Sequence, residues 1–580
     1  MPDIDVLVVG SGAAGMMAAL TAAEAGQKTV LLSKGQVGRS GATATITGDC
    51  CVDGRSCVEV LGLTADRDDT QDTFFEDTIV GGKYLNDQRL AEIMIERIAP
   101  ILKRMRENGM RLGDPIRGPG HRTARGVWVS GMELMQTLKK LLIRQQVKVR
   151  EEFFATDLML NDGVVAGIVG IDQRSGEIVA LNAKTVVLAT GGAMMIYPLQ
   201  TAPEELTGDG HSLALRGGAE LIDMEMVQFL PCVLMDPPIW RGIQFPWLIG
   251  PQSGVRAWLL NRFGERFMAR WDPTNLEFTT RDLISIACMK EIVEGRGGPN
   301  NGVYLSWAHL PTDIIDFAIK WYFRTHLHGD GFWEGFDFSE LIADIKNRRA
   351  VEVTAGSHFY MGGVAIDEHC MTRVPGLFAA GEVAGGVHGA NRLTGNATSQ
   401  ILVQGLVAGL AVAAYAKREP HPDIPRGAWM QARETLESPL KRADGPLPHE
   451  IKSELQALAN FKVGMLRSQA SLDEAQARVA QIRKDVLPTL RCRSKERRYN
   501  KEWADALECR SMLDALEATT RCASERQESR GAHYRDDFPT TKEGLPPQNS
   551  IIEFRGGNMH HRFRSVRAHR LHPPHLVAAK

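Results

Sequence analysis

The first 33 residues carry a glycine pattern that strongly restricts the fold of this 580-residue chain. Residues 4–9 form a mostly apolar run typical of a buried parallel strand, and Gly10-Ser-Gly-Ala-Ala-Gly15 follows directly. Residues 16–25 favour a helix that Gly26 would end, and residues 28–33 predict a second strand. A G-x-G-x-x-G turn between a strand and a helix indicates a dinucleotide-binding βαβ unit, with an ordinary glycine-rich turn as the alternative.

Each glycine of this turn has its own physical role. Gly10 would make the turn, Gly12 would let the backbone approach a pyrophosphate, and Gly15 would let the helix pack on the strand. The diphosphate would then lie against the positive end of the helix dipole. The second strand ends at Ser33-Lys34, where an acid often holds the adenosine ribose. The Ser33 hydroxyl is a candidate substitute, and the missing acid favours a flavin over NAD.

Composition and charge exclude several classes of protein. The 68 basic and 70 acidic residues give a net charge of −2, which excludes a general polyanion-binding surface, and we expect no nucleic-acid partner. No run of about 18 apolar residues occurs, so we expect no transmembrane segment and a buried core helix over residues 401–416. The N-terminus lacks the pattern of a secretory signal. The expected location is the cytoplasm, either free or held at a membrane by a partner.

The nine cysteines show neither a C-x-x-C motif nor the spacing of an iron–sulfur cluster. We therefore expect a reducing compartment, no cluster within this chain, and packing roles for the adjacent Cys50 and Cys51. Residues 553–580 are rich in Arg and His, and we expect a solvated tail or a partner-docking surface there and no metal site. Within that stretch, residues 558–564 alternate in the manner of an interface strand.

Four later segments extend the N-terminal pattern. Residues 183–192 predict a strand that runs into a small-residue turn, and Thr207-Gly-Asp-Gly210 opens a helix. Val374-Pro-Gly-Leu-Phe-Ala-Ala-Gly-Glu382 and His388-Gly-Ala-Asn-Arg-Leu393 follow. Together these segments resemble the succinate dehydrogenase and fumarate reductase flavoprotein family, which is itself similar to L-aspartate oxidase and to the adenylylsulfate reductase catalytic subunit. The resemblance covers most of residues 4–540.

The resemblance implies an α/β fold: a doubly wound, Rossmann-like FAD-binding domain with an inserted α+β capping domain and a C-terminal helical domain. The FAD-binding domain would comprise residues 1–225 and 355–420, and the capping domain residues 226–354. Helical periodicity supports a helical domain over residues 421–535. Residues 536–580 would remain as a basic, histidine-rich tail.

Family positions also imply the contacts with FAD. The ribityl chain would meet Gly381 and Glu382, because a carboxylate accepts hydrogen bonds from hydroxyls. Asp209 matches an acid placed near the flavin, and Gly41 stands where membrane-complex members carry a histidine linked covalently to the cofactor. We therefore expect non-covalent FAD; a turn or capping role is the alternative for each residue. The other implied contacts are Gly10, Gly12, Ala13, Ala14, Ser33, Lys34, Ser40, Ala42, Thr43, Thr47, Gly48, Ala155, Thr190, Gly191, Ala397 and Thr398.

Three matching residues would carry the chemistry. Arg281 begins a predicted helix and matches the family's proton donor, His358 matches a substrate-binding histidine, and Arg392 matches an arginine that clamps a carboxylate. The implied reaction is hydride transfer between flavin N5 and a C=C or CH–CH bond, with cations stabilising the developing enolate charge. A structural ion pair is the alternative role for each arginine.

Two segments depart from the family's pattern. Leu230 stands where the family's V-Q-F-H-P-T carries histidine. Ile249, Gly250 and Ser253 stand where it carries Thr, Glu and Arg, so the proton-relay pair is missing unless Arg256 replaces it. Since Leu and Ile side chains cannot hydrogen-bond, we expect a substrate with one acidic or thioester end and one bulkier apolar end.

The sequence therefore predicts the catalytic flavoprotein subunit of a fumarate-reductase-like or succinate-dehydrogenase-like enzyme acting on a small carboxylate or acyl substrate other than a standard dicarboxylate. Electrons would pass through an iron–sulfur protein subunit or another electron carrier. The alternatives are an adenylylsulfate-reductase-like or aspartate-oxidase-like FAD enzyme, or a non-catalytic electron-transfer flavoprotein subunit. The presence of Arg281, His358 and Arg392 argues against the non-catalytic alternative.

Overall fold

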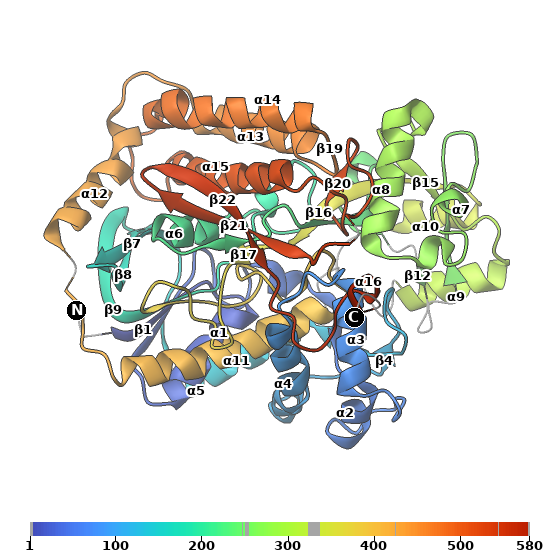
Figure 1. Cartoon of the computed structure of the whole chain (residues 1–580), viewed down its shortest axis with the longest axis horizontal. Helices are drawn as coiled ribbons and strands as arrows, with labels where there is room; N and C mark the ends of the chain where they lie inside the picture. Colours follow the sequence, from blue (N-terminus) through green and yellow to red (C-terminus); the bar gives the residue numbers. More distant parts are fainter. Residues whose placement is uncertain are drawn as a thin grey trace.

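The computed structural model describes residues 4–245, 248–249, 255–322, 337–423, 425–542 and 544–577. Its nucleotide-binding part is built on a seven-stranded sheet of order β6-β2-β1-β9-β8-β7, with β18 paired to β9 (Figure 1). Strands β6, β2, β1, β9 and β18 run parallel, whereas β7, β8 and β9 also form an antiparallel meander. The strands are β1 (Ile4–Val9), β2 (Thr29–Leu32), β6 (Lys148–Arg150), β7 (Phe153–Asn161), β8 (Val164–Asp172), β9 (Glu177–Leu188) and β18 (Leu377–Ala379).

Two helices pack against each other beside this sheet, α1 (Ala13–Glu24) and α11 (Asn396–Ala416). Their contact depends on glycines of α11: a Cβ at Gly405 would lie 2.5 Å from the carbonyl oxygen of Ala14. Among the described residues, α11 is the one helix long and apolar enough to cross a membrane, but 67% of its apolar window is buried in the protein. This agrees with the expected core helix.

Other elements of the nucleotide-binding part pack around α1 and α11, and α6 contacts β7 of the sheet. A small antiparallel sheet of order β3-β5-β4 lies next to the start of α11. Its strands are β3 (Thr47–Cys51), β4 (Pro115–Ile116) and β5 (Gly126–Ser130). The helices are α2 (Gly54–Glu59), α3 (Gln71–Gly81), α4 (Gln88–Glu107), α5 (Gly131–Arg144) and α6 (Asp209–Arg216).

The inserted cap combines a four-stranded antiparallel sheet of order β11-β16-β15-β14 with short helices, and it lies at one end of the molecule (Figure 1). Its own apolar cluster includes Leu230, Phe267, Trp307 and Leu341. The elements are β11 (Val227–Leu234), β12 (Leu248–Ile249), β13 (Val255–Arg256), β14 (Trp258–Leu260), α7 (Met268–Trp271), α8 (Arg281–Glu291), β15 (Val303–Ser306), α9 (Thr312–Tyr322), α10 (Ser339–Lys346) and β16 (Val351–Tyr360). This confirms the α+β cap.

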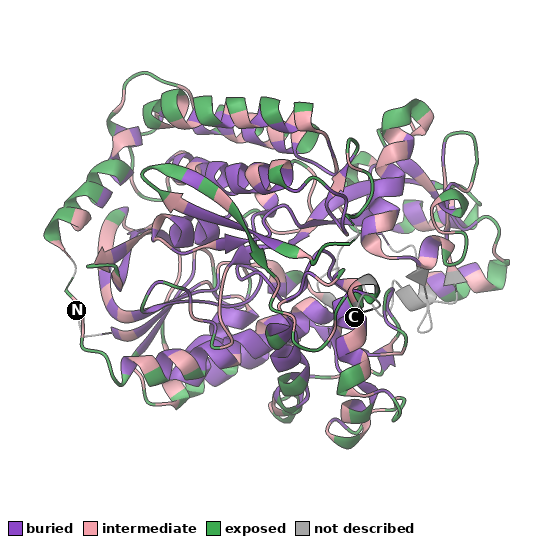
Figure 2. Cartoon of the chain, viewed as in Figure 1, coloured by how far each residue is buried: buried purple, intermediate pink, exposed green. Residues whose placement is uncertain are grey.

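The C-terminal part is helical, as predicted. Helix α15 (Lys501–Glu525) is buried for most of its length under α13 (Pro448–Lys462) and α14 (Gln469–Gln481), and α12 (Arg426–Lys441) precedes them (Figure 2). The short strands β19 (Leu466–Arg467) and β20 (Tyr534–Arg535) pair in parallel and connect the two ends of this region.

The segment expected to be a C-terminal tail is folded for most of its length. Strands β21 (Gln548–Arg555) and β22 (Asn558–Ser565) form a hairpin whose two-residue turn is Gly556-Gly557, both with positive φ, as such turns require. In the sheet order β17-β10-β21-β22, the hairpin pairs with β10 (Leu221–Ile222), which also pairs with β17 (Gly363–Val364). The alternating pattern did predict a strand over residues 558–564. Its partner strand, β21, belongs to this same chain. A last turn, α16 (Pro574–Val577), follows.

We predict that Gly405→Ala destabilises the protein, because its methyl group has no room between α11 and α1. The expected loss is about 1–3 kcal/mol, seen as a lower thermal unfolding midpoint by circular dichroism. Gly427→Ala is the matched control, since a Cβ there meets no atom within 4 Å. It should change stability by less than about 1 kcal/mol. Equal midpoints for the two variants would contradict the packing argument.

Candidate functional site

A cavity of about 760 Å³ opens where the parallel strands end and reaches the cap. Residues just beyond the carboxyl ends of β1, β2, β9 and β18 line it, respectively Gly10, Ser33, Ala189 and Ala380. Open α/β sheets bind their ligands at this edge. The far end of the cavity is lined by residues of the cap, among them Arg281.

Most of the predicted cofactor contacts lie on this cavity. The predicted residues that line it are Gly10, Ala14, Ser33, Lys34, Ser40, Gly41, Ala42, Thr43, Gly48, Ala155, Thr190, Gly191, Asp209, Gly381, Glu382, Ala397 and Thr398. Gly12 and Ala13 are not among the described residues that line the cavity, and of Thr47 the backbone alone is described. Gly12 caps α1, the amide of Ala13 donates to Thr43 Oγ1 at 3.1 Å, and Thr47 pairs with Ser130 in the β3–β5 ladder.

The glycine turn has the geometry that its sequence predicts. Gly10 has φ +110°, and a Cβ there would lie 2.1 Å from the carbonyl oxygen of Ala189. A Cβ at Gly15 would lie 1.9 Å from the carbonyl oxygen of Gly10, so both positions require glycine. At Gly12, in contrast, the nearest atom would be Thr43 Oγ1 at 3.4 Å. The N-terminus of α1 is therefore open to an anionic group such as a diphosphate.

Lys34 lies on the cavity, but its ammonium group is used inside the protein. Nζ is 2.9 Å from Asp209 Oδ2 and 2.7 Å from Glu508 Oε1, and it lies 4.3 Å from the centre of the Phe154 ring. Burial alone would lower the pKa of Lys34, but these two carboxylates raise it above its ordinary value. Lys34 therefore links the nucleotide-binding part to α15. Ser33, whose Oγ is 2.7 Å from Ser11 Oγ, lines the cavity at the end of β2 and stays the candidate for the ribose contact.

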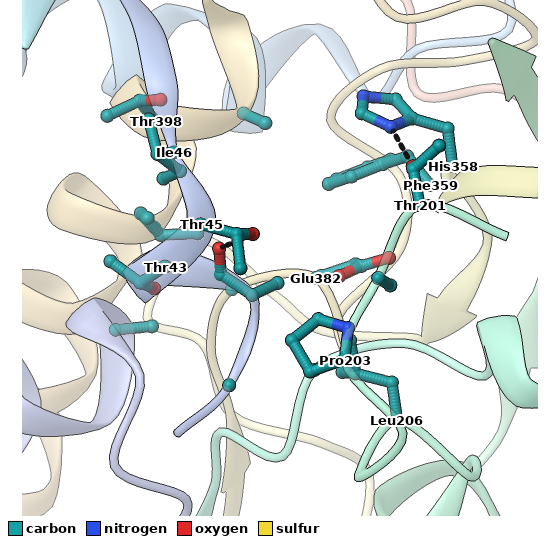
Figure 3. Close-up of a pocket in the computed structure, with 18 of the residues that line it drawn as sticks. Thr43, Thr45, Ile46, Thr201, Pro203, Leu206, His358, Phe359, Glu382 and Thr398 are labelled. Carbon is teal, nitrogen blue, oxygen red and sulfur yellow. Dashed lines mark hydrogen bonds between the residues drawn. The ribbon is translucent and has the colours of Figure 1, made fainter. Parts of the chain in front are cut away.

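The middle of the cavity contains buried polar atoms that require partners. Glu382, labelled in Figure 3, is buried, and burial raises its pKa to about 7; its Oε1 accepts a hydrogen bond from the amide of Tyr360 at 3.1 Å. Thr190 Oγ1 and Asp209 Oδ1 are buried without a hydrogen-bond partner in the described part of the protein. The hydroxyls of a ribityl chain would satisfy such atoms. These residues and the open helix end fit FAD.

The structure brings the three predicted catalytic residues to one cavity. Arg281 begins α8, His358 lies on β16, and Arg392 lies in the loop before α11. His358 Nδ1 is 2.7 Å from Thr201 Oγ1, which leaves the other ring nitrogen for a ligand (Figure 3). Arg392 lies over the Phe359 ring at 4.7 Å, and its carbonyl oxygen accepts a hydrogen bond from Gln228.

The charges of these three residues favour an anion. Burial lowers the pKa of Arg281 to about 10, and burial together with Arg281 lowers that of Arg392 to about 9. Both arginines still carry a positive charge at neutral pH. Burial and the two guanidinium groups lower the pKa of His358 well below its ordinary value, so its ring is neutral. Arg281 Nε and Nη1 and Arg392 Nε are buried without hydrogen-bond partners among the described residues, which a carboxylate would supply.

The structure also identifies cavity residues that the sequence did not. Asp49 on β3, Arg117, Thr201 and Gln244 all line the cavity. Of these four residues, only Asp49 had a signal in the sequence: it is an acid in a strand that otherwise carries small or apolar residues. Thr201 and Gln244 lie in irregular segments, and only the folded chain brings them to the site.

Leu230, which departs from the family's pattern, and Arg256, the candidate replacement for the proton-relay pair, do not line the described part of the cavity. Leu230 is fully buried in the apolar cluster of the cap and does not belong to the described lining. It therefore does not form the apolar wall that we expected, because β11 turns its side chain into the cap. Gly250, Ser253 and the side chain of Ile249 lie outside the described residues. Arg256 donates to the carbonyl oxygen of Asn275 at 2.8 Å and lies outside the described lining.

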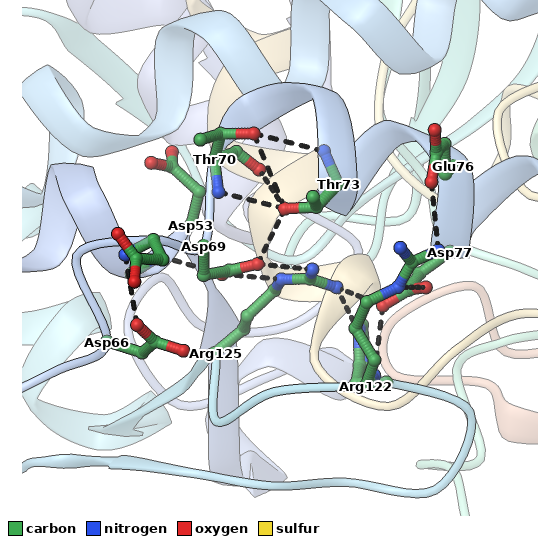
Figure 4. Close-up of polar contacts among 12 residues, drawn as sticks. Asp53, Asp66, Asp69, Thr70, Thr73, Glu76, Asp77, Arg122 and Arg125 are labelled. Atoms are coloured by element: carbon green, nitrogen blue, oxygen red, sulfur yellow. Dashed lines mark hydrogen bonds and ion pairs between the residues drawn. The ribbon is translucent and has the colours of Figure 1, made fainter.

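A buried ion-pair network surrounds Arg125 (Figure 4), and His121 links it to the loop that carries Arg392. Arg125 is fully buried and holds Asp69 through two hydrogen bonds and Asp77 through a third. Arg125 Nη1 also lies 3.3 Å from His121 Nδ1, while His121 Nε2 lies 3.0 Å from the carbonyl oxygen of Thr394. Because arginine only donates, His121 accepts at Nδ1 and donates from Nε2 to Thr394, two residues after Arg392.

We predict that Arg125→Met destabilises the protein by about 3–5 kcal/mol, because it leaves the buried Asp69 carboxylate without its arginine and leaves Asp77 with Arg122 alone among the described residues. Urea denaturation followed by tryptophan fluorescence measures the loss. Arg122→Met is the matched control, since the half-exposed Arg122 also contacts Asp77. Its expected effect is about 0–1 kcal/mol. Similar losses for the two variants would show that burial of the pair is not what matters.

Comparison with known proteins gives a consistent result. A family model described as "FAD binding domain" matches residues 5–398, and one described as "Fumarate reductase flavoprotein C-term" matches residues 452–575. A fumarate reductase (CoM/CoB) subunit of Methanothermobacter marburgensis is 35% identical, and the match covers 93% of this chain and 95% of that protein. The fumarate reductase flavoprotein subunit of Mycobacterium tuberculosis is 31% identical, and the match covers 92% of each chain. The Mycobacterium smegmatis Sdh1 complex in the apo form includes a chain with 30% identity and a TM-score of 0.84, covering 97% of this chain and 94% of that one.

Proposed function

The chain belongs to the succinate dehydrogenase and fumarate reductase flavoprotein family, and we propose that it is the catalytic subunit of an oxidoreductase that interconverts a C=C and a CH–CH bond next to a carboxylate or acyl group. One observation carries this proposal: Arg281, His358 and Arg392 line the same cavity as the glycine turn that fits a dinucleotide. The charged groups that would bind a carboxylate therefore lie in the same cavity as the groups that would bind the cofactor.

Bound FAD supplies the two-electron chemistry of this family. The glycine turn and the N-terminus of α1 would hold its diphosphate, and Glu382 and Thr190 would hold the ribityl chain. Gly41 offers no side-chain atom for a covalent link, which supports non-covalent binding.

The protein's own residues bind and polarise the substrate. Arg392 and Arg281 carry the unpartnered N–H groups that would bind its carboxylate, and their charge stabilises negative charge that develops on the neighbouring carbon. Neutral His358 is held by Thr201 at Nδ1, so its other ring nitrogen would orient the substrate. Because these groups lie away from bulk water, each of these interactions is stronger than it would be at the surface.

Arg281 is our candidate for the group that donates the proton. Its pKa of about 10 brings it nearer to the working range of a general acid than an exposed arginine. Its position at the first residue of α8 acts in the same direction, because the positive end of a helix disfavours a cation.

The electrons would be exchanged with a separate carrier, for which an iron–sulfur subunit is the proposed partner. All nine cysteines are buried and unpaired, and the described residues contain no group of three or more possible metal ligands. The names of the relatives identify them as subunits. Such a partner would also decide whether the protein stays in the cytoplasm or is held at a membrane.

We predict that Arg281→Ala lowers turnover by about 100- to 1000-fold while the purified protein keeps its FAD. The assay follows oxidation of a reduced viologen by a panel of unsaturated mono- and dicarboxylates, with flavin absorbance as the measure of cofactor content. Arg349→Ala is the control, because this exposed arginine of the cap pairs only with Asp344 among the described residues. Unchanged turnover in Arg281→Ala would refute the proposed mechanism and favour a purely electron-transferring protein.

A further inference from the structure

Asp49 is a carboxyl group held in a fixed orientation on the wall of the cavity. It lies on β3, and glycines of two neighbouring segments enclose it. A Cβ at Gly126 on β5 would lie 2.8 Å from Asp49 Cγ, and a Cβ at Gly395 would lie 3.1 Å from Asp49 Cβ. Asp49 Oδ1 is buried and has no hydrogen-bond partner in the described part of the chain. The side chain therefore has little freedom to turn away from the cavity.

Arg281 is the charged group that acts on Asp49. On its own strand Asp49 is followed by the thiols of Cys50 and Cys51, whose pKa values burial and Asp49 raise, so that they stay neutral. Its partner across the ladder is Trp128, which carries no charge. Burial raises the pKa of Asp49 to about 7, and the Arg281 guanidinium opposes that rise.

The charges of the reactive end can now be compared with those of a ligand. Arg281 and Arg392 contribute two positive charges, His358 is neutral, and ionised Asp49 contributes one negative charge. Of the other charged residues that line the cavity, Arg117 is exposed, so water screens its charge, and Glu382 faces the predicted ribityl position. The buried groups of the reactive end therefore leave a charge that matches one carboxylate. A dicarboxylate would bring its second negative charge to a cavity that already contains one, and like charges in a buried site repel strongly.

We propose that Asp49 is a specificity-determining residue, an internal counter-ion to Arg281 that stands in for the second carboxylate of a diacid. The site would then prefer substrates with one carboxylate and an uncharged acyl or apolar remainder. This inference rests on the proposed function of the site and deepens it, since it concerns only which acids the site admits.

The proposal has a consequence for pH. Below about pH 7 Asp49 is protonated and neutral, so both guanidinium groups are available to a ligand. Affinity for a dicarboxylate should therefore rise as the pH falls from 8 to 6. Affinity for a monocarboxylate should change less, because it carries no second charge for Asp49 to repel.

The test measures binding to the FAD-containing protein without an electron donor, so that turnover is not needed. Succinate and butyrate are matched in length and differ in one carboxylate, and their Kd values are measured by flavin absorbance changes or calorimetry. At pH 8 the wild-type protein should bind butyrate more tightly. Asp49→Asn should raise succinate affinity about tenfold or more and weaken its pH dependence; Glu382, whose pKa is also about 7, accounts for any dependence that remains. Asp344→Asn, on the cap surface, should leave the ratio of the two Kd values unchanged.

Two results would overturn this proposal and leave the proposed function intact. The first is a wild-type protein that prefers succinate equally at pH 6 and pH 8, a measurement that requires no variant. The second is a folded Asp49→Asn protein with the wild-type ratio of Kd values. If the wild-type protein bound neither acid at either pH, the proposed function would fail as well.

Discussion

Two buried guanidinium groups that share one cavity are the central constraint on this structure. Burial and the charge of Arg281 lower the pKa of Arg392, and several N–H groups of the two side chains have no partner in the described protein. Removal of such charges from water is unfavourable, and only the surrounding fold keeps them there. Loops, ion pairs and close-packed glycines around the cavity can be understood as the structure that holds two repelling cations in place for an anionic ligand.

The parts of the fold that the sequence predicted are those with a local signal. Gly10 and Gly15 lie within a single turn whose spacing is visible in the sequence, so the βαβ unit could be recognised from the first 33 residues. Arg281 does begin a helix, and the alternation over residues 558–564 does form a strand. The arrangement of Arg281, His358 and Arg392 around one cavity needed the family resemblance, since they come from three distant segments.

The rest of the site could not be read from the chain because it depends on tertiary contacts. Lys34 follows a strand whose carboxyl end faces the predicted nucleotide site, yet its ammonium group forms an ion pair with Glu508 on a helix of the C-terminal part. Leu230 stands at a position that we expected to contact the substrate, yet its side chain packs inside the cap. Asp49 became a candidate only when Gly126, Gly395 and Arg281 were seen around it. In each case the deciding partner is remote in sequence.

Because of the hairpin β21–β22, formation of its sheet depends on the order in which the chain is synthesised. Its inner strand pairs with β10, a two-residue strand that follows α6 of the nucleotide-binding part, and β10 pairs in turn with β17. On the ribosome, residues 221–222 therefore wait for a partner encoded more than 300 positions later. The nascent chain must keep one edge of β10 unpaired until residues 551–552 have emerged, so this sheet forms late in synthesis.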